Sequence, residues 1–292
     1  MLGEIRGEVR FKEPLAFHTS LRCGGPADIF VLPQDVDDVR KALIFADKEK
    51  LPVHVLGGGN NVLVKDRGLH GMVIKLEGCL GRMEFHGEEV TIGGGAGLST
   101  MIREAAALSL GGVECLVGIP ATIGGALAMN AGGPDGAIGD FVSAVYFLHP
   151  DGTIGELKPA PGAFAYRALN FPPGAIVLGA RLALHRKPQK EILAEIKTRL
   201  KQKKATQPLA LASAGMIWKN PAADQVARML EKAGLRGKRV GSAEISAKHA
   251  NFIVNRGGAT AKDILALMEL AFERVFNQTG TRLQAELRVI GN

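Results

Sequence analysis

The first two thirds of the chain alternate short apolar runs with turns rich in glycine. The length of these runs and the turn residues that flank them are typical of strands. We predict strands at residues 29–32, 52–56, 62–64, 71–76, 89–93, 143–148, 153–157 and 176–184. Apolar residues recur at helical spacing only within residues 35–50 and 98–110. Many short strands with two helices predict an α+β layout for this part.

Helical periodicity is more frequent in the last third of the chain. The pattern predicts helices at residues 187–204, 224–233 and 260–278, with Thr260 as the N-cap of the last one. The run ASAGMIWKNP at residues 212–221 predicts a small-residue turn that leads into a strand. Alternation of apolar and polar residues predicts a final strand at residues 283–290.

The helix expected at residues 187–204 has an apolar stripe and a basic face. The stripe consists of Ile192, Leu193, Ile196 and Leu200, and lysines and arginines cover the other side. A solvated helix face accounts for this pattern. Steering of an anionic substrate is the alternative.

The stretch from residue 112 to 139 is the least usual part of the sequence. It carries no charge between Glu114 and Asp135 and has glycine at positions 118, 124, 125, 132 and 133. About 20 apolar residues could cross a bilayer, but Pro120 and the glycines would weaken a helix here. We therefore expect irregular buried backbone whose N–H groups face a large, flat, partly apolar ligand. A glycine-rich loop that only changes direction is the alternative.

A second glycine run, Gly57-Gly58-Gly59-Asn60-Asn61, lies between two predicted strands. Successive backbone N–H groups in such a turn can form a nest for a diphosphate. The run matches neither the GxxxxGK[ST] loop nor the GxGxxG turn, and the glycines at 93–97 also fail the second pattern. A tight hairpin without a ligand would explain residues 57–61 equally well.

Composition favours a folded protein with an anionic partner. The chain has 292 residues, of which 46% are hydrophobic and 22% charged, enough for a large core in two or three units. A net charge of +7 favours anions. Nucleic acid is disfavoured, because one Trp and two Tyr provide no aromatic interleaving and no binding motif is present. Small phosphorylated or carboxylated substrates fit the same charge.

Cysteine and histidine patterns give no sign of a metal site. Cys23, Cys79 and Cys115 are odd in number and far apart, so we expect buried small side chains and not a disulfide framework. The seven histidines form no HxxxH or HExxH pair. The first residues lack the apolar core of a secretory signal, so a cytoplasmic protein is expected.

Seven motifs in a fixed order resemble the UDP-N-acetylenolpyruvoylglucosamine reductase family. They are LRCGGPAD, LGGGNNVLV, VGIPATIGGALAMNAGG, AYR, SAGMIWKNP, KHANFIVN and AELRVIG, and the resemblance extends from about Phe17 to Gly291. Each motif alone is weak, but together they are specific. No obvious insertion lies between Gly139 and Lys187, as in the shorter class of the family.

The resemblance implies an α+β fold with two parts. An FAD-binding half of the vanillyl-alcohol-oxidase (PCMH) type, in two subdomains, is followed by a C-terminal α/β substrate domain. Residues 1–76 would form the first subdomain, joined by the final strand at 283–292, residues 77–204 the second, and residues 205–282 the substrate domain. The FAD pyrophosphate would be held by Gly57, Gly58, Gly59, Asn60 and Asn61. The cofactor would be lined by Gly118, Ile119, Pro120, Thr122, Gly124 and Gly125.

The reaction implied by the resemblance has two halves that share one site. NADPH reduces FAD and leaves, and UDP-N-acetylglucosamine enolpyruvate then accepts a hydride from flavin N5 and is protonated. Arg167 of AYR and Glu286 of AELR would polarise the substrate carboxylate and steady the enol, and an Arg fork suits a carboxylate. Without the resemblance, Arg167 could equally pair with a structural carboxylate, and Glu286 could be a solvated strand residue.

One position departs from the family pattern. Where the family usually has a Ser or Cys that protonates the substrate, this chain has Met216, whose thioether has no proton to give. Ser213, three residues upstream, or an ordered water could replace it. Alternatively the protein reduces slowly or acts on another substrate. Because general acid catalysis contributes about 10²–10⁴-fold, a site served by water could still turn over.

Further substrate contacts are expected from Tyr166, Lys219, Asn220 and His249, of which Lys219 and His249 are chosen by position alone. We expect a monomer with no nucleic-acid or membrane partner. Two other functions fit the same residues: an FAD-linked oxidoreductase with another substrate, and a non-catalytic paralogue that binds a nucleotide sugar.

Overall fold

The computed structural model describes residues 2–220 and 225–292, which form two compact units. The first unit contains residues 2–10, 29–58 and 71–201, and the second contains residues 11–28, 59–70 and 202–292. Each unit is therefore built from three separate stretches of sequence.

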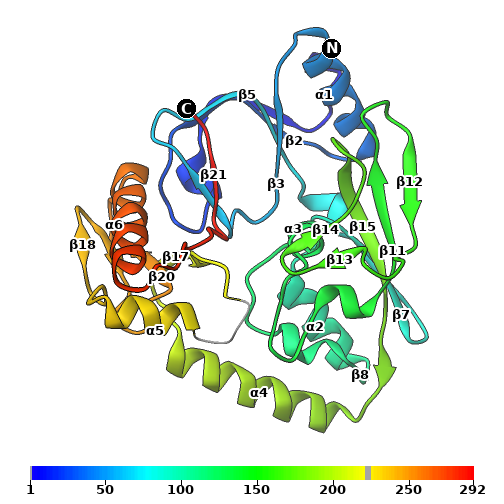
Figure 1. Cartoon of the computed structure of the whole chain (residues 1–292). Helices are drawn as coiled ribbons and strands as arrows, with labels where there is room; N and C mark the ends of the chain where they lie inside the picture. Colours follow the sequence, from blue (N-terminus) through cyan, green and yellow to red (C-terminus); the bar gives the residue numbers. More distant parts are fainter. Residues whose placement is uncertain (1, 221–224) are drawn as a thin grey trace. The chain divides into compact units, whose positions relative to one another are not determined.

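A four-stranded sheet and one helix begin the first unit (Figure 1). The strand order is β1-β2-β5-β3, and β3 and β5 are parallel. Helix α1 (Val36–Lys48) begins after the N-cap Asp35, whose side chain accepts from the Asp38 amide. Its apolar side buries Val39, Ala42 and Ala46 in one cluster with Met72 and Ile74 of the sheet. The strands are β1 (Glu8–Pro14), β2 (Pro26–Leu32), β3 (Val53–Leu56) and β5 (Leu69–Lys75).

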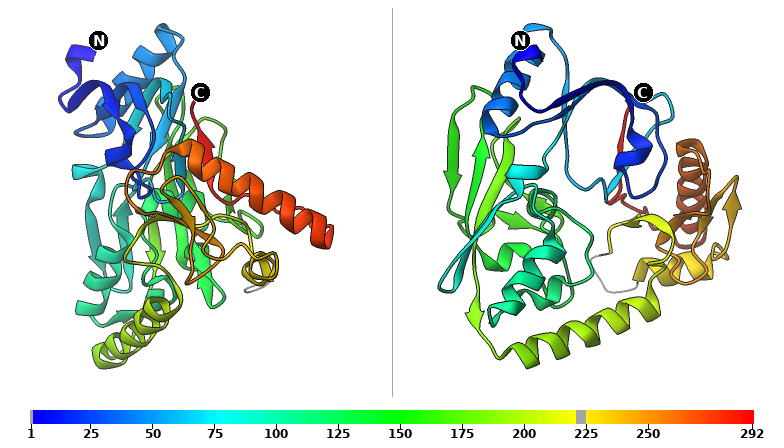
Figure 2. Two further views of the ribbon diagram at one scale, coloured as in Figure 1. Left: turned by 90° about the vertical axis from the view of Figure 1, so that its left-hand side faces the viewer. Right: turned by 180° about the vertical axis from the view of Figure 1, so that it is seen from behind.

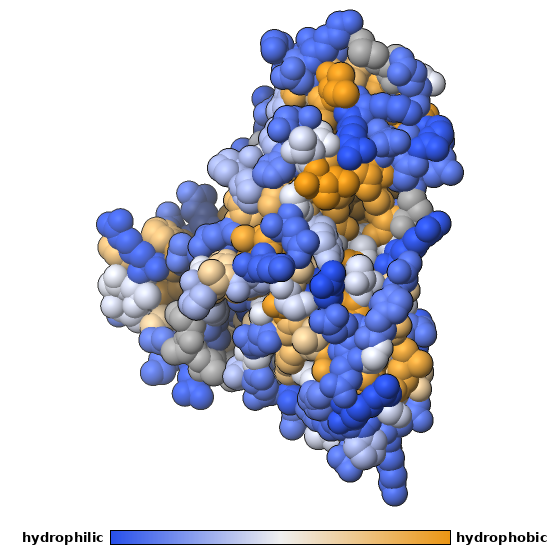
Figure 3. Space-filling view, turned by 90° about the vertical axis from the view of Figure 1, so that its right-hand side faces the viewer, coloured by the Kyte–Doolittle hydropathy of each residue, from blue (hydrophilic) through white to orange (hydrophobic). Residues whose placement is uncertain are grey.

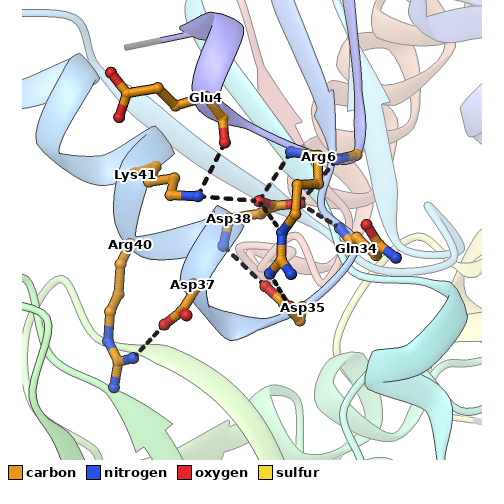
Figure 4. Close-up of polar contacts among 9 residues, drawn as sticks. Glu4, Arg6, Gln34, Asp35, Asp37, Asp38, Arg40 and Lys41 are labelled. Carbon is orange, nitrogen blue, oxygen red and sulfur yellow. Dashed lines mark hydrogen bonds and ion pairs between the residues drawn. The ribbon is translucent and has the colours of Figure 1, made fainter.

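Asp38 ties the N-terminal segment to α1 (Figure 4). Its fully buried carboxylate accepts from the backbone amides of Arg6 (3.0 Å), Gly7 (2.8 Å) and Gln34 (2.9 Å). Burial alone raises the pKa of the Asp38 carboxyl, but these backbone hydrogen bonds outweigh burial and hold the pKa below its ordinary value. The charge of Asp38 therefore stabilises the folded first unit.

The centre of the first unit is an antiparallel five-stranded sheet in the order β12-β11-β15-β7-β6. Helix α2 (Leu98–Ala107) buries Leu98, Met101 and Ile102 in the same cluster as Val90 and Ile92 of β7. The predicted hairpin at residues 143–157 is confirmed by the pairing of β11 with β12. The strands are β6 (Met83–His86), β7 (Glu89–Gly93), β11 (Val142–Leu148), β12 (Ile154–Leu157) and β15 (Ile176–Ala183).

The stretch from residue 112 to 139 is mainly irregular, as expected, but it contains a helix that the sequence pattern missed. Helix α3 (Ile123–Ala128) has only six residues, because glycine and Pro120 interrupt the apolar run on which a longer helix would depend. Interpretation of this stretch as a membrane span is wrong, since a span needs about 20 helical residues.

Three two-stranded pairs complete the unit: β8 (Leu110–Gly111) with β16 (His185–Arg186), β9 (Gly132–Gly133) with β10 (Gly136–Ala137), and β13 (Phe164–Ala165) with β14 (Ala168–Leu169).

The helix predicted at residues 187–204 is α4 (Gln189–Thr206), but its apolar stripe is only partly buried. Ile192 is buried, whereas Leu193 and Leu200 are 51% and 40% exposed. The stripe is therefore narrower than the sequence indicates. Lys187, just before α4, bonds Glu114 (2.9 Å) and Glu195 (2.7 Å), and Arg199 bonds Glu195 (2.8 Å), so ion pairs hold this end of the helix in the first unit.

The second unit has its own core around an antiparallel sheet in the order β17-β20-β19-β18. Helix α6 (Ala261–Thr279) begins at the predicted N-cap Thr260, which forms a capping box with Asp263. Its Ile264, Leu267 and Ala271 are buried in one cluster with Ile245 and Ile253 of the sheet. Residues 221–223 and Asp224, the predicted first residue of the preceding helix, lie outside the described residues; α5 is Gln225–Lys232. The strands are β17 (Ala212–Met216), β18 (Arg239–Val240), β19 (Ala243–Ile245) and β20 (Phe252–Asn255).

A parallel pair of strands, β4 (Val62–Val64) and β21 (Arg288–Ile290), lies side by side in the second unit (Figure 2). Two expectations change as a result. The hairpin alternative for residues 57–61 is wrong, because β3 pairs with β5 and β4 pairs with β21. The strand predicted at residues 283–290 is limited to β21. Residues 284–287 instead contact residues 217–219 through one isolated bridge and a few backbone hydrogen bonds.

The face drawn in Figure 3 shows hydrophobic residues in small groups between larger hydrophilic areas. Large apolar side chains exposed on the first unit include Ile44, Leu108 and Ile154. Among the helices of the described residues, none combines the length and the hydropathy needed to cross a bilayer.

Candidate functional site

Two segments expected to hold the cofactor meet in the first unit. A Cβ atom at Gly57 would overlap Thr122 Oγ1, so the Thr122 side chain packs directly against the Gly57 backbone. Thr122 caps α3 by accepting from the Gly125 amide (3.3 Å). The amide of Gly124 donates to the carbonyl of Gly94 (2.8 Å), so the glycine run at 93–97 supports the same segment.

The exposure of this segment fits a surface that a ligand covers. Gly118, Ile119, Thr122, Gly124 and Gly125 are all partly accessible, and Pro120 is exposed. Their neighbours Leu116, Ile123, Ala126 and Leu127 are fully buried. The accessible side therefore consists of backbone and small side chains, which lets a flat ring system approach the main chain. These residues fit the FAD expected from the sequence.

The pyrophosphate segment continues into the second unit. Gly59 has a φ of +63°, a conformation that favours glycine, and its carbonyl accepts from the Ser20 amide (3.1 Å). Asn61 donates its side-chain amide to the carbonyl of Glu286 (3.0 Å) and accepts from the Arg288 amide with its own carbonyl (3.1 Å). The side chain of Asn61 thus has a structural contact.

Arg167 occupies the tip of a hairpin in the first unit. The pairs Phe164–Leu169 and Ala165–Ala168 close the loop Tyr166–Arg167. Arg167 has a φ of +58°, in the left-handed region that few residues other than glycine occupy. Its guanidinium lies 5.0 Å from the centroid of the Tyr166 ring, a cation–π distance. Arg167 is one of six non-glycine residues with a positive φ in the part of the chain that the structure describes.

Asn130 holds this hairpin and was not identified from the sequence. Its side-chain amide donates to the carbonyl of Ala165 (3.0 Å), and its Oδ1 accepts from the Gly139 amide (3.0 Å). Asn130 itself has a positive φ of +39°. The only signal was its place in the motif VGIPATIGGALAMNAGG, of which only residues between Gly118 and Gly125 were predicted to line the cofactor.

A β-bulge brings Ser213 and Met216 to the same face of the sheet in the second unit. Ser213 pairs with Val254 and Met216 with Phe252, so three steps along β17 match two steps along β20. Gly215, inside the bulge, has a φ of +75°. Side chains two residues apart on β20 share a face, and their partners on β17 share it as well. Without the bulge, Ser213 and Met216 would point to opposite faces.

Glu286 is held by its backbone on both sides. Its amide donates to the carbonyl of Ile217 (2.8 Å), and its carbonyl accepts from Asn61. The side chain is half-buried, and its Oε2 atom is shielded from solvent. A solvated strand residue, the alternative considered from the sequence, does not describe this position.

The remaining predicted substrate residues also lie in the second unit and carry structural contacts. Lys219 donates its amide to the carbonyl of Gln284 (2.8 Å). Asn220 Oδ1 accepts from the Val226 amide (3.1 Å) near the start of α5. His249 Nδ1 accepts from the Asn251 amide (3.2 Å), and its ring packs edge-on against Phe252. None of these contacts tests substrate binding.

Each unit contains its own set of predicted residues: Arg167 and Tyr166 in the first, and Ser213, Met216, Lys219, Asn220, His249 and Glu286 in the second.

The described residues contain no group of three or more His, Cys, Asp or Glu able to hold a metal ion. Cys23 is a buried free thiol, and burial raises its pKa to about 11. Cys115 is free but only half-buried, and the side chain of Cys79 lies outside the described residues.

Comparison with known proteins agrees with this arrangement. Residues 27–158 match the family model of an FAD binding domain, and residues 207–290 match the C-terminal domain of UDP-N-acetylenolpyruvoylglucosamine reductase. The chain is 40% identical to UDP-N-acetylenolpyruvoylglucosamine reductase 2 of Symbiobacterium thermophilum, over 98% of this chain and 93% of that protein. It is 41% identical to the reductase of Geobacter metallireducens, over 99% and 96%.

Solved structures give the same result. The structure of the reductase (MurB) from Thermus caldophilus aligns with a TM-score of 0.84 and 36% identity, covering 98% of this chain and all of that one. Physcomitrella patens BBE-like 1 aligns at 15% identity with a TM-score of 0.51, over 94% of this chain and 59% of that one, which shows a shared fold only.

These matches confirm the predicted fold class, a flavoprotein fold with an FAD-binding half and a C-terminal domain. The chain belongs to the UDP-N-acetylenolpyruvoylglucosamine reductase family, whose members are FAD-dependent oxidoreductases of peptidoglycan synthesis. Its length fits the shorter class, and the resemblance inferred from seven motifs is confirmed.

Proposed function

We propose that this chain reduces UDP-N-acetylglucosamine enolpyruvate to UDP-N-acetylmuramate with FAD as cofactor and NADPH as reductant. The observation that carries the proposal is the match to both family models and to reductases at about 40% identity over nearly the whole chain. Residues 1–76 with 283–292, residues 77–204 and residues 205–282 would then act as two cofactor subdomains and a substrate domain. We expect the enzyme to work as a cytoplasmic monomer.

Arg167 and Glu286 have the central roles in this proposal. The Arg167 fork binds the substrate carboxylate and stabilises negative charge that spreads onto it. Glu286, fixed through its backbone, steadies the enol form. Bound flavin supplies the hydride in this chemistry. Tyr166, Lys219, Asn220 and His249 contribute further contacts to the substrate.

Ser213 is the proton donor that we propose in place of Met216. The bulge puts Ser213 on the face of the sheet that Met216 occupies, and a hydroxyl can pass a proton directly or through one water, which a thioether cannot. General acid help of this kind contributes about 10²–10⁴-fold. We therefore expect Ser213→Ala to lower kcat within that range while KM changes little.

The deciding experiment measures substrate-dependent NADPH consumption by the parent and by the variants Ser213→Ala, Met216→Ser and Met216→Leu. Met216→Ser restores the family's usual donor and should raise kcat above that of the parent. Met216→Leu is the matched control, because neither Met nor Leu carries a transferable proton. No turnover in the parent together with turnover in Met216→Ser would refute retained reductase function.

The same measurements separate the alternative functions. A yellow protein that NADPH bleaches, but that the UDP-sugar enolpyruvate does not reoxidise in any variant, would be an oxidoreductase for another substrate. Binding of the UDP-sugar without any flavin reduction would indicate a non-catalytic paralogue.

A further inference from the structure

The segment Ile217–Lys219 connects β17, the strand that carries the proposed proton donor Ser213, with Glu286. It follows β17 directly in the chain, so its position restrains Met216 at the end of that strand. The carbonyl of Ile217 accepts from the amides of Glu286 (2.8 Å) and Leu287 (3.2 Å), and the Lys219 amide donates to Gln284 (2.8 Å). Trp218 forms an isolated antiparallel bridge with Ala285. Any displacement of this segment therefore moves both Met216 and Glu286.

Asn251 fixes that segment from the other side. It is fully buried, just before β20, and its side chain makes two hydrogen bonds with one residue. Oδ1 accepts from the Trp218 amide (3.0 Å), and Nδ2 donates to the Trp218 carbonyl (2.9 Å). The backbone carbonyl of Asn251 also accepts from the Ile217 amide (2.9 Å). The side-chain amide thus acts as an extra peptide unit that extends the β17–β20 ladder beyond Met216.

We propose that Asn251 is a positioning residue for protonation of the substrate, because it sets the placement of the donor strand and of Glu286 together. The inference rests on the proposed function. Asn61, which holds the Glu286 carbonyl, and Asn251, which acts through Ile217 and Trp218, restrain Glu286 from its two sides. Since misplacement of catalytic groups by about 1 Å can cost 10²-fold, loss of the Asn251 side chain should slow this step about 10- to 100-fold.

Asn255 offers a matched control in the same unit. It is also buried, four residues later, and its side chain also bonds backbone: it donates to Leu21 (2.8 Å) and accepts from Gly257 (2.8 Å) and Ala259 (3.0 Å). None of these partners belongs to the Ile217–Lys219 segment. Asn251→Leu and Asn255→Leu keep the number and branching of the side-chain heavy atoms and remove the amide, so both should lower Tm to a comparable extent.

The test follows each half of the reaction separately in the FAD-loaded full chain. The flavin is reduced anaerobically with dithionite and mixed with UDP-N-acetylglucosamine enolpyruvate, and its reoxidation is recorded. We expect slow reoxidation in Asn251→Leu, with reduction by NADPH and the apparent KM unchanged, and rates close to the parent in Asn255→Leu. Equal reoxidation rates in the two variants would overturn the proposal, because a purely structural role predicts equality.

Trp218 supplies a readout that does not depend on activity, because it is the only tryptophan of the chain. Asn251→Leu should increase hydrogen exchange at the Trp218 amide and shift the tryptophan emission to longer wavelength, whereas Asn255→Leu should do neither. If Asn251→Leu does not fold, Asn251→Asp serves, since it keeps an acceptor for the Trp218 amide and replaces the donor to the Trp218 carbonyl with a carboxylate oxygen. Failure of the parent flavin to be reoxidised by the UDP-sugar would refute the proposed function. Unchanged Trp218 exchange in both Asn251 variants would instead refute the positioning role.

Discussion

Arg167 has a backbone conformation that glycine adopts readily and arginine adopts rarely. A left-handed φ costs a non-glycine residue on the order of 1–3 kcal/mol, and glycine would occupy the same turn without strain. The hairpin nevertheless carries a guanidinium there, held through Asn130 and the ring of Tyr166. This position therefore combines a strained backbone with a charged side chain at the tip of the loop.

Replacement of Arg167 by glycine should separate stability from function. Arg167→Gly relieves the strained φ but loses chain rigidity, so the free energy of unfolding should stay within about 1 kcal/mol of the parent. The kcat/KM for the UDP-sugar should fall at least about 10-fold, because a charge-assisted hydrogen bond contributes about 1.5–3 kcal/mol. Urea unfolding and steady-state kinetics measure the two quantities.

Arg103→Gly is the control, in which stability should fall while activity stays unchanged. Arg103 is 70% exposed in its side chain and lies within α2, where glycine costs about 1 kcal/mol of helix stability. That variant should be less stable and fully active. An Arg167→Gly enzyme as active as the parent would remove Arg167 from the site.

The residues predicted from sequence and those missed differ in a physical respect. Arg167, Glu286 and Met216 were predicted from their places in motifs that resemble those of the family, and their roles stay predictions. Asn130 and Asn251 act by replacing a backbone partner with a side-chain amide, and that role depends on which distant strand passes by. Nothing in the local sequence distinguishes such an Asn from one in an ordinary turn.

At the scale of elements, the helices of eight or more residues and most strands of the first unit were predicted, but β1, β6 and the strands β18, β19 and β20 were missed. Periodicity located α1, α2, α6 and the hairpin β11–β12 to within a few residues. It missed α3, which glycine and proline disguise, and it extended β21 backwards over residues 283–287. The bulge in β17 was also invisible, because an extra residue shows only against the register of its partner strand.

Gly215 should be needed for this bulge. Gly215→Ala puts a Cβ at a φ of +75°, which should cost about 1–2 kcal/mol of stability and shift Ser213 relative to Met216. We expect kcat to fall clearly with little change in FAD affinity. Gly280→Ala is matched, since Gly280 has a φ of +69° and, like Gly215, has open space where a Cβ would lie. A similar loss of stability in both variants, with kcat lowered only in Gly215→Ala, is the expected result; equal kcat values would contradict it.

At the scale of the whole molecule, the sequence did not predict that the stretches of the two units alternate along the chain. Each unit collects three separate stretches, and the chain crosses between units within β1, β2 and β5. Local periodicity has no information about such returns, so the predicted division at residues 76, 204 and 282 follows the order of the chain and stays a prediction. Family motifs gave the fold class because they sample the whole chain.

Buried carboxylates should determine the acid limit of the second unit. A side-chain hydrogen bond from Arg256 is the main cause that lowers the pKa of Glu244, and Arg239 adds to it, although burial opposes both. A lowered folded-state pKa means stability that is present above the unfolded value, about 4.3, and is lost as pH falls through the folded value. Glu244→Gln should therefore show less loss of stability than the parent below about pH 4.5.

Urea unfolding at several pH values measures this difference. Glu231→Gln is the control, because Glu231 pairs with Arg236 at the surface (3.1 Å), where an ion pair contributes little. Parallel pH profiles for the parent and Glu244→Gln would contradict the assignment.

The contact between Asn61 and Glu286 joins positions 225 residues apart. During translation at about 5–20 residues per second, the loop that carries Asn61 leaves the ribosome on the order of 10 s or more before its partner strand exists. The nascent polypeptide must therefore keep β4 unpaired for that whole interval, during which this segment is exposed to chaperones and proteases.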